Sequence, residues 1–173
     1  MVSIVQTSMD KIMTIEKLSF LDVDLIPENE FNLYTCMTTI DQPIHMSSQV
    51  RFQPTGTYSD IYPFLVGGVL AVPPDVFRRL NGFSNRYFDW GGEDDDMGLR
   101  LLAKDICVQR PVAGFYFAAS HEKQKRNQQR FELLSDAVLH GNTDGLNDID
   151  RLAKVVMAVD YPLFQWIHVH WVL

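Results

Sequence analysis

The chain has 173 residues, of which 46% are hydrophobic and 21% charged, and it carries a net charge of −7 at pH 7. This length suits one domain with a sizeable core, so we expect residues 1–173 to form a single domain. The negative charge and the lack of a basic stripe exclude a nucleic-acid partner, and no apolar stretch is long enough to span a membrane.

The first half of the chain predicts two strands and a long loop. Apolar residues at helical spacing up to Leu18 predict a short N-terminal helix. Residues 18–21 then form an apolar run that stops at Asp22, which predicts a buried strand ending at a polar site. Residues 38–60 are polar and rich in turn formers, so we expect a loop with one edge strand. Residues 64–72 predict a second buried strand, interrupted by Gly67-Gly68.

The second half alternates helices with strands. Prolines at 73 and 74 predict the start of a helix that Asn81-Gly82 ends in a left-handed cap. Further helices are expected over residues 94–104 and 128–140. Strand patterns follow at 115–119 and 165–173. This alternation favours an α/β domain.

The sequence Asp22-Val23-Asp24 is the first candidate site. In an extended segment, residues i and i+2 point to the same side, so both carboxylates can face one ion. Two such oxygen donors suit Mg²⁺ or Mn²⁺, with water and phosphate oxygens completing the shell. His121 follows an apolar strand pattern and becomes a metal-ligand candidate if Asp24 lies close to it.

The run Glu93-Asp94-Asp95-Asp96 is a more specific signal. Four consecutive acids repel one another, and a helix start offsets only part of that repulsion. Trp90 and two glycines precede them, an aromatic plate followed by a flexible loop that could close over a ligand. We interpret this segment as a carbohydrate site. A Ca²⁺ loop fits less well, because contiguous acids cannot all face one ion.

These residues together resemble the β-1,4-galactosyltransferase family. The resemblance runs in order from about residue 18 to the C-terminus, and its motifs are Asp22-Val23-Asp24-Leu25-Ile26-Pro27, Pro43 with His45, Gly67-Gly68-Val69, Asn81-Gly82-Phe83-Ser84-Asn85, Trp90-Gly91-Gly92-Glu93-Asp94-Asp95-Asp96, Gln129-Arg130-Phe131 and Asp144-Gly145-Leu146-Asn147. It implies an α/β fold of the GT-A type, a nucleotide-diphospho-sugar transferase, that is N-terminally truncated. The family half that holds the uridine has no counterpart here, and residues 1–17 would form a divergent N-terminal segment.

The family transfers galactose, or N-acetylgalactosamine, from a UDP-sugar to the 4-hydroxyl of an acceptor sugar with inversion, uses Mn²⁺, and works in the Golgi lumen. The resemblance makes Asp94 the general base and Asp24 and His121 the metal ligands. The residues it places at the donor are Asp22, Val23, Asp24, Leu65, Gly68, Trp90 and Glu93. Those it places at an acceptor ending in N-acetylglucosamine are Tyr62, Gly92, Glu93, Asp94, Asp95, Arg130, Phe131 and Leu134.

The chain departs from the family pattern at several positions. Ala118 stands where the family has a methionine metal ligand, which weakens the expected Mn²⁺ site. Leu65 stands where galactose enzymes carry tyrosine, and its smaller side chain implies room for an N-acetylgalactosamine donor. Lys17 replaces the disulfide partner of Cys36, and we expect Cys36 and Cys107 to be buried free thiols.

Two functions therefore stay open from the sequence. The first is a glycosyltransferase that joins galactose or N-acetylgalactosamine to terminal N-acetylglucosamine. The second is a truncated, non-catalytic derivative that retains the acceptor-sugar pocket and binds carbohydrate.

Overall fold

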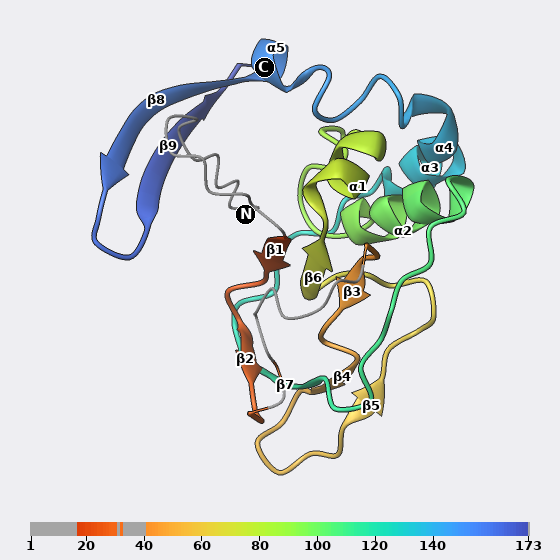
Figure 1. Cartoon of the computed structure of the whole chain (residues 1–173), viewed down its shortest axis with the longest axis vertical. Coiled ribbons are helices and arrows are strands. Elements are labelled where there is room, and N and C mark those ends of the chain that lie inside the picture. Colours follow the sequence, from red (N-terminus) through yellow and green to blue (C-terminus); the bar gives the residue numbers. More distant parts are fainter. Residues whose placement is uncertain (1–16, 31, 33–40, 173) are drawn as a thin grey trace.

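The computed structural model describes residues 17–30, 32 and 41–172 (Figure 1). Short strands and helices alternate along most of this range. The strands are β1 (Leu18–Leu21), β2 (Leu25–Pro27), β3 (Ile44–His45), β4 (Gln49–Arg51), β5 (Ser59–Asp60), β6 (Val69–Val72), β7 (Phe115–Ala118), β8 (Ala153–Asp160) and β9 (Gln165–Trp171). The helices are α1 (Pro74–Arg79), α2 (Glu93–Ala103), α3 (Arg130–Ser135), α4 (Ala137–His140) and α5 (Ile149–Leu152).

The strands form three small sheets. Their strand orders are β1-β6-β3, β2-β7-β4-β5 and β8-β9. Neighbouring strands run antiparallel, except for β4 and β7, which are parallel. Together with α1 and α2, the first two sheets confirm the predicted α/β class.

Strand β6 lies at the centre of the core, and both of its faces are buried. Leu70 and Val72 pack in a cluster with residues of α1 and α2, whereas Val69 and Ala71 pack in a second cluster with Tyr116 of β7. Alternate residues of a strand point to opposite faces, which is why one strand serves both clusters. Full burial of a side chain of this kind contributes about 1.5–3 kcal/mol.

The strand predictions are confirmed in outline and wrong in detail. Residues 64–68 do not form a strand, and the chain turns at Gly68, whose φ is +88°. Glycine also fits here because a Cβ would lie 2.6 Å from Leu25 Cδ1. Residues 18–21 do form β1, but only half-buried, because β1 stands at the end of its sheet's strand order. Leu18 therefore begins a strand rather than ending a helix, and residues 1–16 lie outside the described range. Residues 41–60 contain three short strands instead of one.

The predicted helices α1 and α2 are confirmed. Asn81 (φ 61°) and Gly82 (φ 68°) end α1 in the left-handed conformation, as expected. The single helix predicted over 128–140 is wrong: Asp136, with φ −117° and ψ 8°, separates α3 from α4. At this break, the Asp136 carboxylate accepts two hydrogen bonds from the Arg86 guanidinium.

A buried ion-pair network ties α2 to the loop at Asp144. The Arg100 guanidinium donates to Asp96 Oδ1 at 2.5 Å and to Asp144 Oδ2 at 3.1 Å. It also donates to the backbone carbonyl of Asp144 at 2.8 Å. Asn81 donates to the same carbonyl, so the loops that follow α1 and α4 are held together. Two motifs of the family resemblance thus have a structural role here.

The β8–β9 hairpin extends away from the rest of the molecule (Figure 1). Strand β9 was predicted, whereas the apolar run of β8 was not recognised as a strand. Many of its apolar side chains are exposed, among them Val155, Val156 and Leu163. Within the described part of the chain, no helix is both long and apolar enough to cross a membrane. Cys107 is a free thiol as predicted, but it is exposed rather than buried, and Cys36 lies outside the described residues.

Candidate active site

The four consecutive acids occupy the first turn of α2, where the helix dipole favours negative charge. Their side chains take different directions. Asp96 is buried and pairs with Arg100 and Tyr87, so its role is structural. Asp95 accepts a hydrogen bond of 2.5 Å from the Tyr62 hydroxyl. Burial is the main cause that raises the pKa of Tyr62, and this hydrogen bond is the second. The remaining two acids are thereby left for other chemistry.

Asp94 lies directly against the backbone of Gly67. A Cβ at Gly67 would overlap the Asp94 carboxylate, so any larger residue at this position would displace that carboxylate. Burial raises the pKa of Asp94 to about 7, and the negative charges of Glu93, Asp22 and Asp95 add to the effect. A carboxyl group with this pKa exchanges its proton near neutral pH, as a general base must.

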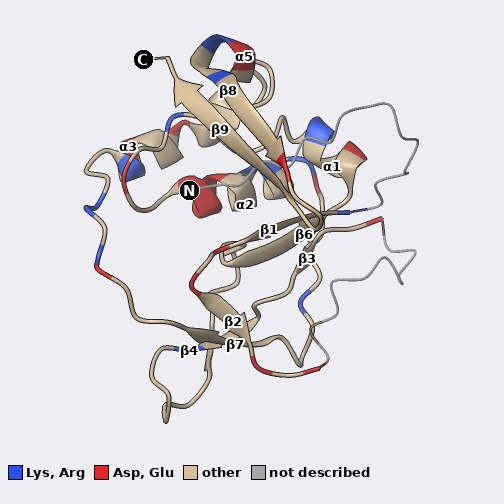
Figure 2. Ribbon diagram, turned by 90° about the vertical axis from the view of Figure 1, so that its left-hand side faces the viewer, with Lys and Arg blue, Asp and Glu red and all other residues tan. Residues whose placement is uncertain are grey.

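Asp22-Val23-Asp24 forms the turn between β1 and β2 rather than an extended strand end. The Asp22 carbonyl accepts from the amide of Leu25, and the Asp22 amide donates to the Gly68 carbonyl at 2.8 Å. Burial raises the pKa of Asp22, and the charges of Asp24 and then Glu93 raise it further. The turn therefore faces the same region as the acidic run. In Figure 2, the red start of α2 and the red turn between β1 and β2 lie on the same side of the molecule.

Glu93 contributes an unsatisfied oxygen to this region. Its Oε2 is buried and has no hydrogen-bond partner. Such an atom is rare in a folded protein, since leaving it unpaired costs about 1–3 kcal/mol. A donor supplied by a ligand, such as a sugar hydroxyl, would remove that cost.

Asp24 and His121 come together although 97 positions separate them in the sequence. His121 Nε2 lies 3.4 Å from Asp24 Oδ2, and both side chains are accessible to solvent. The other ring nitrogen, Nδ1, lies 2.7 Å from the Glu122 carbonyl. Donation from Nδ1 to this carbonyl leaves the lone pair of Nε2 free for a metal.

This donor set fits Mn²⁺, but it is small. One carboxylate oxygen and one imidazole nitrogen are suitable ligands. Ala118 adds none, and among the described residues no group of three or more His, Cys, Asp or Glu side chains could hold an ion. A metal held here would need further oxygens from water or a diphosphate.

Trp90 and the two glycines after it form a loop next to α3. The Trp90 backbone pairs with residues 125–127, and the Arg126 guanidinium lies 5.7 Å from its indole ring. Gly91 (φ 102°) and Gly92 (φ 105°) both have left-handed conformations. A Cβ on Gly92 would lie 2.7 Å from the Tyr87 ring, so glycine is needed here for fit as well as for flexibility.

The predicted acceptor residues are only partly brought together. The Arg130 side chain packs over Gly91 and Gly92 and so borders the Trp90 loop. Phe131 stacks on the Arg130 guanidinium at 4.4 Å, but it is 69% exposed. Leu134 is half-buried in α3, and Val23 is 95% exposed in its turn.

A buried polar network behind Gly67 was not predicted from the sequence. His45, singled out only as part of the resemblance, has Nε2 at 2.7 Å from the Gly67 carbonyl. Ser47 Oγ donates to the same carbonyl at 3.3 Å and accepts from the Val69 amide at 3.0 Å. The Arg110 guanidinium faces His45 Nδ1. No local pattern could have linked these positions, because they come from separate strands and loops.

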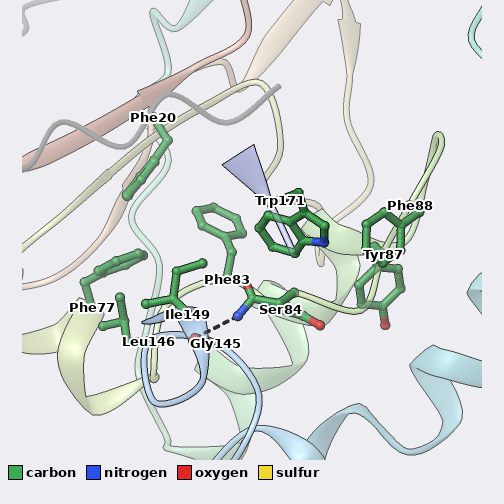
Figure 3. Close-up of a pocket in the computed structure, with 11 residues that line it drawn as sticks. Phe20, Phe77, Phe83, Ser84, Tyr87, Phe88, Gly145, Leu146, Ile149 and Trp171 are labelled. Carbon is green, nitrogen blue, oxygen red and sulfur yellow. Dashed lines mark hydrogen bonds between the residues drawn. The ribbon is translucent and has the colours of Figure 1, made fainter. Parts of the chain in front are cut away.

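A cavity of about 290 Å³ lies elsewhere, between β1, the loop at residues 83–88 and the end of β9 (Figure 3). Aromatic rings of Phe20, Phe77, Phe83 and Trp171 point into it. The cavity is mainly apolar, and none of the acids described above lines it. It is therefore separate from the candidate site.

A family model described as the N-terminal domain of galactosyltransferase matches residues 49–122. The chain is 43% identical over 142 residues to β-1,4-galactosyltransferase 4 of Rattus norvegicus, an alignment that covers 79% of this chain and 40% of the relative. Identity to human β-1,4-galactosyltransferase 3 is 39% over 133 residues, covering 74% of this chain and 33% of the relative. Over most of its length, the chain is therefore similar to the β-1,4-galactosyltransferases.

The chain spans between about a third and two fifths of the length of the relatives it matches. Solved structures agree on its GT-A-like fold. The catalytic domain of Drosophila β-1,4-galactosyltransferase 7 in complex with xylobiose superposes with a TM-score of 0.67 at 21% identity, covering 91% of this chain and 68% of that chain. A variant of the Drosophila enzyme in complex with manganese, UDP-Gal and xylobiose matches equally well, at 22% identity and over the same shares of the two chains.

Proposed function

We propose that this chain carries the acceptor and metal side of an inverting glycosyltransferase site. The site would transfer galactose from UDP-galactose to the 4-hydroxyl of an acceptor ending in N-acetylglucosamine. One observation carries the proposal: Asp94, with its raised pKa, lies against Gly67 in a region that also faces the Asp22–Asp24 turn. The relatives named above are galactosyltransferases, which supports the same reaction class.

Asp94 would act as the general base. As a carboxylate it would accept the proton of the acceptor 4-hydroxyl while that oxygen attacks the anomeric carbon of the donor. Attack from the side opposite the diphosphate gives inversion. Burial, and after it the charges of the neighbouring acids, raise the pKa of Asp94, so it is a stronger base than an exposed aspartate.

Neighbouring groups would hold the two sugars. The unpaired Glu93 Oε2 would accept a hydrogen bond from a sugar hydroxyl. Asp95 would accept another, with its carboxylate held in place by the Tyr62 hydroxyl. Trp90 offers an indole face, half-exposed, to a sugar ring. Gly92, Arg130, Phe131 and Leu134 would form the wall around the acceptor's N-acetyl group, with Val23, Leu65 and Gly68 on the donor side.

Asp24 and His121 would hold the manganese ion, which when bound would offset the negative charge that develops on the leaving UDP. If so, Mn²⁺ should raise the affinity for UDP at least tenfold, and His121→Ala should remove that gain. His140→Ala is a matched control, because His140 also lies 3.2 Å from a half-exposed aspartate, Asp136. Isothermal titration with and without Mn²⁺ measures the effect. Equal UDP affinities with and without the ion would refute the metal site.

The donor preference provides a separate prediction at Leu65. Its side chain is half-buried and smaller than tyrosine, and its neighbours Phe64 and Gly67 lie against α2. We therefore propose that UDP-N-acetylgalactosamine is also accepted. Leu65→Tyr should lower its kcat/KM by about 10–200-fold relative to UDP-galactose, the range for a steric contact in a binding pocket. Leu139→Tyr, an exposed position on α4, is the control. An unchanged donor ratio would show that Leu65 does not select the donor.

A second function is favoured by one observation. With only two protein donors for the metal among the described residues, the chain could bind sugar without transferring it. Titration with the acceptor sugar separates the two: carbohydrate binding that is independent of UDP and Mn²⁺ supports the binding module. A location in the Golgi lumen, implied by the family resemblance, belongs to the transferase proposal.

A further inference from the structure

We propose that Arg110 and His45 are positioning residues for the candidate base. Together they hold segment 62–67, and the N-terminal half of α2 rests on that segment. This inference rests on the proposed function in so far as Asp94 is taken to be the base.

Segment 62–67 contacts α2 at successive points and has no helix or strand of its own. The contacts are Tyr62 with Asp95, Phe64 with Gly98, and Gly67 with Asp94. A Cβ on Gly98 would lie 2.5 Å from the Phe64 carbonyl oxygen, so the backbone of the segment packs directly on the helix. The direction of the Asp94 carboxylate therefore depends on where this segment lies.

Arg110 holds the middle of the segment. Its Nη2 donates to the Pro63 carbonyl at 2.5 Å and to the Leu65 carbonyl at 2.9 Å. The residue before it, Gln109, is fixed by backbone hydrogen bonds to Pro43 and His45. The guanidinium thus connects an irregular segment to the backbone that forms β3.

His45 holds the end of the segment. The residue is fully buried, and its Nε2 lies 2.7 Å from the Gly67 carbonyl, while Nδ1 faces Arg110. Arg110 can only donate, so Nδ1 must be the acceptor and Nε2–H the donor to Gly67. This arrangement requires a neutral ring. Burial, together with the Arg110 charge, lowers the pKa of His45 to about 4, which keeps the ring neutral at pH 7.

The two side chains form one chain of contacts that ends at Asp94. From Arg110 it runs through His45 to the Gly67 backbone, and Gly67 touches the carboxylate. Loss of the guanidinium would release the Pro63 and Leu65 carbonyls and leave His45 Nδ1 without this donor. A misplacement of about 1 Å at a reacting group can reduce the rate of transfer about 100-fold.

The test compares Arg110→Gln with Arg51→Gln. Arg51 of β4 is a suitable control because it also donates to two backbone carbonyls, those of Gln53 and Pro54, and to Glu28, while β4 lies away from α2 (Figure 1). We expect Arg110→Gln to lower kcat for galactosyl transfer at least 30-fold, with KM for UDP-galactose changed less than threefold. Arg110→Lys keeps the charge but has only one donor nitrogen, so its kcat should lie between those of the wild type and Arg110→Gln. It replaces Arg110→Gln if that variant does not fold.

Hydrogen exchange at the Leu65 amide gives a second measurement that needs no activity. That amide donates to the Tyr62 carbonyl within the segment. Its exchange should accelerate at least tenfold in the Arg110 variant and stay unchanged in Arg51→Gln. Unchanged Leu65 exchange, or a kcat within threefold of the wild type, would overturn the inference. If the wild-type chain transfers no galactose, the proposed function fails, and the exchange result alone decides this inference.

Discussion

Asp94→Asn is expected to lower galactosyl transfer by about two to four orders of magnitude while making the folded protein more stable at neutral pH. The amide has nearly the same shape as the carboxyl group but cannot accept the acceptor's proton. Loss of a general base lowers rates by about 10²–10⁴-fold. We therefore expect kcat to fall within this range with little change in the KM of either substrate.

The gain in stability follows from the raised pKa of Asp94. The unfolded chain releases this proton near pH 3.8, whereas the folded chain retains it up to about pH 7. The folded state binds more protons between these values, so stability falls as pH rises from about 4 to 7 and stays low above. Asparagine removes this penalty. The variant should gain on the order of 2–4 kcal/mol at pH 7.5 and almost nothing at pH 4.

Thermal unfolding at both pH values, combined with a transfer assay, checks the two effects together. Asp75→Asn is the control, because Asp75 occupies the first turn of α1 but is exposed. It should leave galactosyl transfer unchanged. If Asp94→Asn retained transfer, Asp94 would not be the base. A lower melting temperature at pH 7.5 would contradict its burial as an unpaired acid.

Arg100→Ala is expected to produce the largest loss of stability. The change would leave two buried carboxylates, those of Asp96 and Asp144, without their cationic partner. Removing one member of a buried ion pair costs about 3–5 kcal/mol. Arg100→Lys should recover only part of this loss, because one ammonium group cannot replace the several bonds of the guanidinium.

Urea unfolding measures this effect, with Arg151→Ala as the control. Arg151 is largely exposed and lies 3.6 Å from Asp148, so its removal should change stability by less than about 1 kcal/mol. A loss below 1 kcal/mol in Arg100→Ala would show that the network contributes little to the fold.

The fold was predictable where short-range chemistry decides it. Prolines 73 and 74 start α1, and the left-handed Asn81-Gly82 pair ends it, because these preferences depend on each residue's own backbone. The break at Asp136 was missed because its carboxylate bonds to Arg86, 50 positions away. Strand β8 was missed because its long apolar run lacks a period-two pattern and pairs only with β9.

The site was predictable in its members but not in its arrangement. The Asp24–His121 approach was stated as a condition, and the structure meets it. The roles assigned to individual site residues, and the single-domain interpretation of residues 1–173, stay predictions. The contact between Gly67 and Asp94 could not be foreseen, because it depends on the path of segment 62–67. Nor could Arg110, whose acceptors are backbone carbonyls that leave no sequence signal.

The most direct test of the account is the product itself. The chain is incubated with UDP-galactose, Mn²⁺ and an acceptor ending in N-acetylglucosamine, and the new linkage is determined by NMR. We predict a β-1,4-linked galactose that forms only with the metal and is lost in Asp94→Asn. Absence of product under conditions where titration shows both UDP and acceptor bound would contradict the account.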